Sequence, residues 1–198
     1  MPLARYYLAC MPEEPLKSQI LGEQKMLYDR YGLKAMFNSP PHITLYRPFE
    51  WEESREPYLT NSLICNFKFK PFDVVVEGFS GFPRRVLFLK IAPNEELQAL
   101  YKSLRRFMRE RLGIINEYSN AYGFTPHITL AFRDLKPALY DALITAYKNR
   151  IFEGRFNVSK IWLLKHDRTW KPIVNFGSFV LVYGHNGTPW THARFLGM

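Results

Sequence analysis

The sequence predicts an α+β fold in which two related lobes meet along a cleft. The pentapeptide Pro-His-Ile-Thr-Leu occurs twice, at residues 41–45 and 126–130. Each copy is β-branched and apolar, begins with proline and lies between turn-forming residues, which is typical of a short strand. Around both copies, the expected elements run in the order strand, helix, motif strand, helix, strand. This repeated order indicates an internal duplication more strongly than the five identical residues do.

The first half of the chain supplies five of these elements. Residues 5–11 are apolar enough for a buried strand, and a helix is expected from about Leu16 to Tyr31, where a glycine would end it. The motif strand is expected to end at Arg47-Pro48, because proline cannot donate to a sheet and restricts the residue before it. A helix and a strand follow, and glycine and proline predict a hairpin connection. The helix is expected over 53–65, the strand over 72–77 and the hairpin connection over 79–83.

The second half repeats this order. Residues 86–91 are expected to form a strand, and apolar residues at i, i+3 and i+4 spacing predict a helix over 97–112. Pro137 suits the first turn of the helix that follows the second motif. A final hairpin is expected to pair residues 158–164 with residues 176–183, and the tail beyond it is expected to be loosely ordered.

The composition favours a soluble protein with an anionic partner. The 198 residues are 47% hydrophobic and contain 27 Lys and Arg against 18 Asp and Glu, a net charge of +9. Such an excess favours nucleic acid without requiring it. Cys10 and Cys65 lack metal-ligand spacing and are expected to be free thiols. The sequence shows no secretory signal and no apolar run long enough for a membrane span, so we expect a cytoplasmic protein without a membrane partner.

The two motifs carry the residues that we expect to perform chemistry. Alternate side chains of a strand share a face, so His42 lies beside Thr44 and His127 beside Thr129, about 6.6 Å apart along each strand. Two histidines that flank one phosphate suit general acid and base catalysis near neutral pH. The threonine hydroxyls are placed to donate hydrogen bonds to charge developing on the phosphate oxygens. These four residues are therefore expected to form a catalytic site that needs no metal or other cofactor.

Other interpretations fit the sequence less well. A pair of core histidines on two similar strands is the simplest alternative, but the duplication on matching elements favours catalysis. A zinc site would need three or four ligands at short spacing, and the chain has neither Cys-x-x-Cys nor His-Glu-x-x-His. The remaining histidines, at positions 166, 185 and 192, lie in polar segments and are expected at the surface.

The paired His-x-Thr-x motifs resemble those of the 2H phosphoesterase superfamily, specifically its LigT-like branch of RNA 2′,3′-cyclic phosphodiesterases, also called 2′-5′ RNA ligases. Residues 79–89 and 125–131 are also similar to segments of that family. The resemblance implies a bilobal, pseudo-twofold fold of duplicated β-α-β-α-β units, with antiparallel sheets around a central cleft. It implies one domain over residues 1–198, with lobes over about 1–80 and 84–184, and leaves an exchange of terminal strands between the lobes open.

The resemblance also implies roles for the motif residues. One histidine acts as base on water and the other as acid on the ribose oxygen, and we assign His127 as base and His42 as acid, with Thr44 and Thr129 holding the phosphate. The expected activity is hydrolysis of 2′,3′-cyclic phosphate ends of RNA or of a related small cyclic nucleotide. The alternatives are 2′-5′ ligase or 2′-5′ phosphodiesterase activity, and a non-catalytic RNA-binding module on the same scaffold. We expect a monomer without an obligatory protein partner.

The sequence departs from the family beside each motif. Relatives often carry an arginine four residues after the first histidine and five after the second; Tyr46 and Phe132 occupy these positions here, and Arg47 and Arg133 follow them. Strand alternation places Tyr46 and Arg133 on the cleft face and Arg47 away from it. Aromatic and basic side chains bind single-stranded RNA. The expected substrate-binding residues are Tyr46, Arg133, Phe82, Arg84 and Tyr122.

Overall fold

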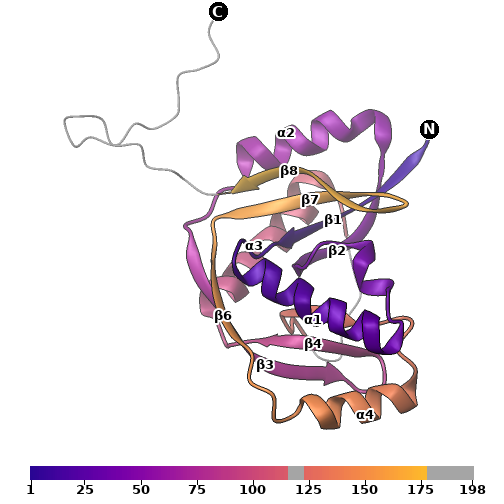
Figure 1. Cartoon of the computed structure of the whole chain (residues 1–198). Helices are drawn as coiled ribbons and strands as arrows, with labels where there is room; N and C mark the ends of the chain where they lie inside the picture. The colour runs from indigo at the N-terminus through magenta and orange to yellow at the C-terminus, as the bar shows by residue number, and fades with distance from the viewer. Residues whose placement is uncertain (116–122, 178–198) are drawn as a thin grey trace, which may run out of the picture.

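The computed structural model describes residues 1–115 and 123–177, which form one sheet flanked by helices (Figure 1). In chain order the elements are β1 (Leu3–Cys10), α1 (Leu16–Tyr31), β2 (Ile43–Glu52), α2 (Glu56–Asn66), β3 (Phe72–Phe82), β4 (Val86–Ile91), α3 (Glu95–Leu112), β5 (His127–Ala131), α4 (Pro137–Tyr147), β6 (Glu153–Val158), β7 (Lys160–Asp167) and β8 (Thr169–Gly177). Short 3₁₀ helices, η1 (Ala35–Asn38) and η2 (Glu53–Arg55), precede β2 and α2. The order strand, helix, strand, helix, strand is found twice, although β6 and not the expected strand over 158–164 completes the second half. The α+β fold class is confirmed.

The eight strands of the described residues form a single antiparallel sheet in the order β6-β3-β4-β5-β2-β1-β7-β8. The two motif strands, β2 and β5, are neighbours at its centre, where Ile43 pairs with Ile128. On either side of this pair, β3 lies beside β4, and β7 lies beside β1. Each half of the sheet therefore combines strands from both halves of the sequence.

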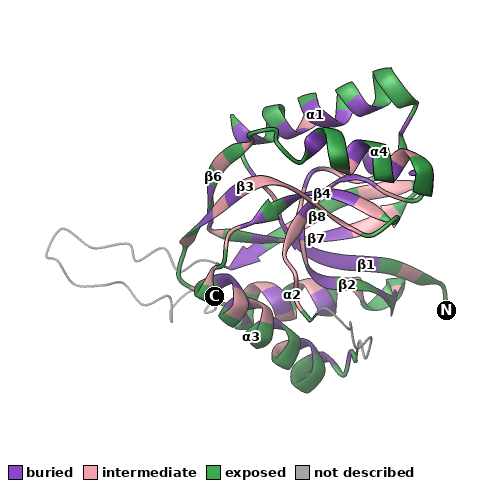
Figure 2. Cartoon of the chain, turned by 90° about the horizontal axis from the view of Figure 1, so that it is seen from below, coloured by how far each residue is buried: buried purple, intermediate pink, exposed green. Residues whose placement is uncertain are grey.

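The helices cover the sheet in two pairs (Figure 2). α2 and α3 pack against β8 and β2, whereas α1 and α4 pack against β3, β4, β5 and β6. α1 thus lies over the second motif strand, although it precedes the first motif in the chain. Gly154 of β6 permits this close approach, because a Cβ atom there would collide with the side chain of Leu16. Further along α1, Glu23 forms an ion pair of 2.6 Å with Arg150, which lies between α4 and β6.

Most buried side chains lie between the sheet and the helices (purple in Figure 2). Along β1, Tyr6 and Leu8 face this main core, whereas Tyr7 and Ala9 face the opposite side of the sheet and form a smaller cluster with Leu164 of β7. Both faces of β1 are therefore buried, as predicted for the first strand. No helix in the described part of the chain has both the length and the apolarity to cross a bilayer.

β2 continues past its expected end at Arg47-Pro48. Tyr6 pairs with Phe49 and Leu8 with Tyr46, so the dipeptide lies opposite a single residue of β1. This β-bulge interrupts the ladder at the position where proline lacks an N–H to donate. The prediction was wrong because proline is tolerated at a bulge.

β3 and the final hairpin also differ from the prediction. β3 runs to Phe82 rather than ending near Glu77, because Gly78, with φ of +71°, lies at a bulge and does not reverse the chain. The last hairpin joins β7 to β8 through Arg168, and β6 was not predicted as a strand. Residues 178–183 of the expected last strand lie outside the described residues.

Candidate active site

The four motif residues face one side of the sheet at the junction of β2 and β5. The two central isoleucines pair with each other and are fully buried in the main core, so their neighbours in each strand point the opposite way. In an antiparallel pair, this register places His42 across from Thr129 and Thr44 across from His127. Each histidine therefore faces the threonine of the other motif.

Backbone carbonyls fix the tautomer of both imidazoles in the same way. Nδ1 of His42 lies 2.7 Å from the carbonyl oxygen of Pro40, and Nδ1 of His127 lies 2.8 Å from that of Thr125. A carbonyl can only accept, so Nδ1 carries the hydrogen in each ring. Nε2 of each neutral imidazole is then unprotonated and able to exchange a proton with a ligand.

Two adjoining cavities lie beside these residues. The larger, of about 210 Å³, is lined by His42, Thr44 and Thr129, and the smaller, of about 90 Å³, is lined by His127 and Thr44. Thr44 lines both cavities, so they meet at this residue. Within residues 1–115 and 123–177, neither threonine hydroxyl has a hydrogen-bond partner, so both are able to donate to a ligand.

Aromatic rings surround both imidazoles and limit their contact with water. The ring centre of His127 lies 5.1 Å from that of Phe82 and 4.8 Å from that of Phe88. The ring centre of His42 lies 5.0 Å from that of Tyr7. An imidazolium in either position would lose much of its hydration, which favours the neutral ring.

The pKa values of both histidines follow from this burial. Burial lowers the pKa of His42 to about 4; the Pro40 carbonyl opposes the shift, and the charge of His127 adds to it. Burial also lowers the pKa of His127, and the positive charge of Arg47 adds to that shift. Both imidazoles are neutral at pH 7 in the free protein, and a bound anion would raise the pKa of each.

The model of the 2′-5′ RNA ligase superfamily matches residues 12–170 of this chain. The chain belongs to this superfamily. Both histidine-threonine motifs lie within the matched residues. The predicted family is thereby confirmed.

Relatives that are more than 30% identical support this membership, and solved structures share the fold. A protein of Geobacillus kaustophilus (strain HTA426) named "Putative phosphoesterase" is 33% identical over 163 residues, which cover 81% of this chain and 87% of that protein. A protein of Geobacillus sp. (strain WCH70) with the same description is 31% identical over 139 residues, 69% of this chain and 73% of its own. TT0787 of Thermus thermophilus has a TM-score of 0.64 at 23% identity and covers 87% of this chain and 96% of its own. E. coli LigT complexed with 3′-AMP has a TM-score of 0.63 at 19% identity, over 88% and 98%.

A β-bulge follows the threonine in both motif strands of this superfamily member. One residue, Leu45 in β2 and Leu130 in β5, is extra in the pairing with the neighbouring strand. The bulge shifts the alternation of side chains by one position. In β2, Tyr46 therefore turns towards the core, and Arg47 returns to the side of the site.

Tyr46 and Arg47 thus exchange the positions that strict alternation predicts. Tyr46 is 4% exposed, and its hydroxyl donates to the carbonyl oxygen of Ile114 at 2.8 Å, although the residue also lines the smaller cavity. Arg47 lines the same cavity and acts on the pKa of His127. The expectation that Arg47 points away from the cleft was wrong, because the bulge at Leu45 was not anticipated.

The other expected substrate-binding residues are divided. Arg133 lines the larger cavity, and Phe82 packs on His127. Arg84 is exposed, pairs with Asp141 at 3.1 Å and lines neither cavity. Tyr122 lies outside the described residues. The structure therefore brings Arg133 and Phe82 to the motif residues and leaves Arg84 apart.

Several cavity residues were not predicted. At the smaller cavity, Tyr101 of α3 stacks on Phe124 with ring centres 3.8 Å apart, and Arg105 lies beside them. At the larger cavity, Gln24 of α1 is buried and donates to a backbone carbonyl of β5 at 3.0 Å, and Trp170 of β8 forms part of the wall. These residues come from helices and strands that cross between the halves of the sheet, which no local sequence pattern indicates.

Metal-ligating residues are not gathered in the described ranges. Within residues 1–115 and 123–177, no three His, Cys, Asp or Glu side chains lie close enough together to hold a metal ion. Cys10 is buried, Cys65 is exposed, and both are free thiols. The cavities offer imidazoles, hydroxyls and guanidiniums, which suit an anionic ligand.

Proposed function

We propose that this chain is a phosphodiesterase that opens the 2′,3′-cyclic phosphate at an RNA end or on a small nucleotide, with two histidines as acid and base. The observation that carries the proposal is the matched pair of imidazoles, each with Nδ1–H held by a carbonyl and each across from a threonine. Membership of the 2′-5′ RNA ligase superfamily supports it. E. coli LigT, a neighbour in fold, was solved with 3′-AMP, a nucleotide of the kind that ring opening releases.

The proposed reaction is one displacement at phosphorus. The base takes a proton from water as the water oxygen bonds to phosphorus, and the bond to O2′ or O3′ breaks as the acid gives that oxygen its proton. The product is a phosphate monoester beside a free hydroxyl. Thr44 and Thr129 would donate to the non-bridging oxygens, where charge develops. Each proton transfer typically contributes about 10²–10⁴-fold in rate.

The two cavities favour different roles for the histidines. The larger cavity beside His42 has room and aromatic walls, Trp170 and Phe132, for the nucleoside whose oxygen leaves. The smaller cavity beside His127 has a volume that suits a water molecule better than a nucleoside, and Arg47 lies there to attract the anion. We therefore assign His42 as acid and His127 as base. The bound anion supplies the charge that favours the protonated acid.

The superfamily favours a second candidate, which is the joining of RNA ends by opening the same cyclic phosphate with a 5′-hydroxyl. In this reaction a 5′-hydroxyl would take the place of water, and its oxygen would bond to phosphorus as the bond to O3′ breaks, which leaves a 2′-5′ bond and a free 3′-hydroxyl. The same base would take the proton of the 5′-hydroxyl and the same acid would protonate the leaving ribose oxygen, so both reactions need the same site. Products formed with and without added 5′-hydroxyl RNA distinguish hydrolysis from joining.

Turnover of 2′,3′-cyclic AMP in the presence of EDTA tests the proposal, with the product identified by ³¹P NMR. We expect turnover by the wild type and a loss of about 10²–10⁴-fold in His42→Ala and in His127→Ala. Added imidazole should restore part of the rate, which a misfolded variant would not show. Equal rates for the wild type and both variants would reject the catalytic assignment, and a rate abolished by EDTA would indicate a metal-dependent enzyme.

A further inference from the structure

A row of aromatic and cationic side chains leads from His42 across β1, β7 and β8. The ring of Tyr7 lies 5.0 Å from that of His42, and the ring of Trp170 lies 4.6 Å from that of Tyr7. The ring of His166 lies 4.9 Å from that of Trp170, and its Nδ1 is 3.1 Å from the guanidinium of Arg5. Tyr7 and Arg5 belong to β1, His166 to β7 and Trp170 to β8. We name these four residues the β7–β8 strip, after the hairpin that carries its outer part.

The strip connects the larger cavity with a second hollow. Trp170 is part of the wall of the larger cavity, whereas Arg5, His166 and Lys171 line a separate hollow of about 560 Å³. The guanidinium carbon of Arg5 lies 6.0 Å from the centre of the Trp170 ring. The two hollows therefore adjoin across Trp170, and a ligand longer than one nucleotide could occupy both.

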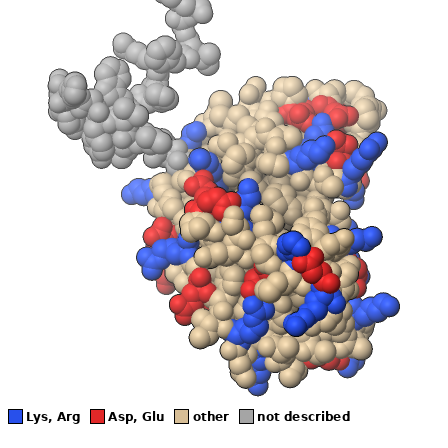
Figure 3. All heavy atoms as spheres, viewed as in Figure 1, with Lys and Arg blue, Asp and Glu red and all other residues tan. Residues whose placement is uncertain are grey.

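Two cations of this region are able to bind an anion. In the described part of the chain, no carboxylate pairs with Arg5. Lys171 pairs with Asp167 at 2.9 Å, but both side chains are more than half exposed, and ion pairs of this kind are weak. Lys165 differs, because two glutamates hold its ammonium at 2.7 Å. On the face shown in Figure 3, Lys and Arg are interspersed with Asp and Glu, so charge alone does not mark a path for nucleic acid.

We propose that the part of the β7–β8 strip that reaches solvent, Trp170, His166 and Arg5, binds together with Lys171 the RNA strand on the 5′ side of the nucleotide that carries the cyclic phosphate, while the buried Tyr7 supports Trp170. Aromatic faces that stack bases, beside cations that neutralise phosphates, are the usual means of holding single-stranded RNA without reading its sequence. With the terminal nucleoside in the larger cavity, the preceding nucleotides pass Trp170, and their phosphates reach Arg5 and Lys171. This inference rests on the proposed function and makes a strand of several nucleotides a better substrate than a mononucleotide.

The test compares two substrates that end in the same nucleotide, 2′,3′-cyclic AMP and a hexaadenylate with a 2′,3′-cyclic phosphate. The measured quantity is the ratio of kcat/KM for the hexanucleotide to kcat/KM for the mononucleotide. In Arg5→Ala/Lys171→Ala, the removal of two exposed cations that neutralise phosphates should lower this ratio about tenfold. The salt dependence of the hexanucleotide reaction should also weaken, by about 0.7 in log–log slope for each phosphate that is no longer neutralised.

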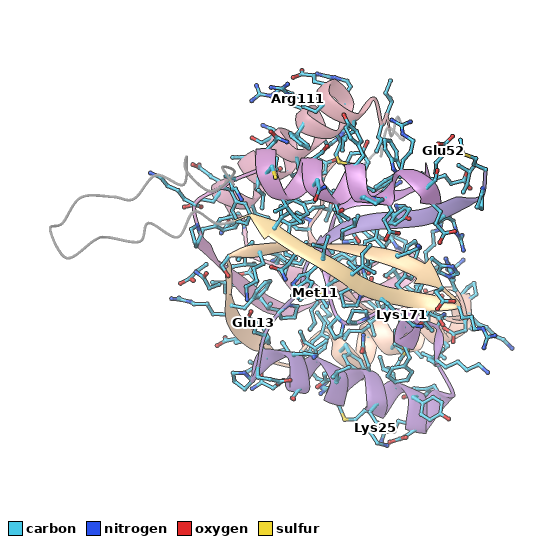
Figure 4. The ribbon with its side chains drawn as sticks, turned by 90° about the horizontal axis from the view of Figure 1, so that it is seen from above. Met11, Glu13, Lys25, Glu52, Arg111 and Lys171 are labelled. Atoms are coloured by element: carbon cyan, nitrogen blue, oxygen red, sulfur yellow. The ribbon has the colours of Figure 1, made fainter. Side chains whose placement is uncertain are left out.

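Lys25→Ala/Arg30→Ala is the matched control. It removes one lysine and one arginine from α1, and Lys25 has an exposed i,i+4 partner, Asp29, as Lys171 has in Asp167. Figure 4 shows Lys25 on α1, well apart from Lys171 on the β7–β8 hairpin. This control should keep the wild-type ratio.

The outcomes separate this inference from the proposed function. A wild-type ratio near one, or a ratio that Arg5→Ala/Lys171→Ala leaves within twofold of the wild type, would overturn the role of the strip while turnover of 2′,3′-cyclic AMP still supports the proposed function. If the wild type turns over neither substrate, the proposed function fails. Binding of a hexaadenylate with a 3′-phosphate, measured by fluorescence anisotropy, then decides on the strip by the same comparison of variants.

Discussion

Replacing each motif threonine by valine removes the hydroxyl and keeps the shape of the side chain. Thr44→Val and Thr129→Val retain β-branching, so β2 and β5 should keep their pairing. Neither hydroxyl bonds to another group in residues 1–115 and 123–177, so no hydrogen bond within that part of the chain is lost. The tautomers of the histidines should also be unchanged, because backbone carbonyls fix them. The substitution therefore isolates the contribution of the hydroxyl to the reaction.

The magnitude follows from the position of each hydroxyl. A pre-aimed donor to a developing oxyanion contributes about 3–4 kcal/mol, which corresponds to about 10²–10³-fold in kcat. Thr44 lines both cavities, whereas Thr129 lines only the larger. We therefore expect Thr44→Val to lie at the upper end of this range and Thr129→Val at the lower end.

The assay is steady-state hydrolysis of 2′,3′-cyclic AMP across the pH range, with thermal unfolding measured on the same samples. Thr145→Val, an exposed position of α4, is the matched control and should keep the wild-type kcat. The reasoning would be refuted by a loss below threefold in both motif variants, or by a pH profile that moves with either substitution, since the hydroxyls are expected to stabilise charge and not to transfer protons.

Three further predictions use other parts of the structure. The bell-shaped profile of kcat/KM should peak on the acidic side of pH 6.5, the ordinary pKa of histidine, because burial lowers the pKa of His42 and of His127; a peak above pH 7 would contradict this. Arg47→Met should move the profile to higher pH, since its positive charge lowers the pKa of His127, and an unmoved profile would exclude that influence. Arg150→Met should lower the free energy of unfolding in urea by about 1–3 kcal/mol, because the nearly buried carboxylate of Glu23 loses two hydrogen bonds. The double variant Arg150→Met/Glu23→Gln should recover part of this loss, because it leaves no unpaired charge.

The sequence was sufficient to place the strands that carry the motifs and the order of most elements. His-Ile-Thr-Leu reveals which side chains share a face because its period of two is local and strong. The order strand, helix, strand, helix, strand could be recognised because the strand period of 2 and the helix period of 3.6 are both local patterns. The long apolar stripe of α3 and its glycine end were equally clear.

The remaining features depend on contacts between distant segments. The bulges at Leu45 and Leu130 reverse the side-chain directions after each motif, and a bulge exists only in the pairing with a neighbouring strand. For this reason the sequence predicted that the side chain of Arg47 points away from the cleft, whereas it lines the smaller cavity. The crossing of α1 onto β5 brings Gln24 to the site, and the pairing of β7 with β1 brings Trp170 close to Tyr7. No single stretch of sequence contains either relation.

A substrate whose leaving group needs no proton gives the most direct test of the two-histidine account. On 2′,3′-cyclic AMP, His42→Ala and His127→Ala should both lose about 10²–10⁴-fold. On the five-membered cyclic phosphate ester of 4-nitrocatechol, water still attacks phosphorus but the oxygen that leaves is a phenolate that is stable without an acid, so His42→Ala should regain most of the wild-type rate while His127→Ala remains impaired. Equal impairment of both variants on the activated ester, or recovery by His127→Ala instead, would contradict the assignment of His42 as acid and His127 as base.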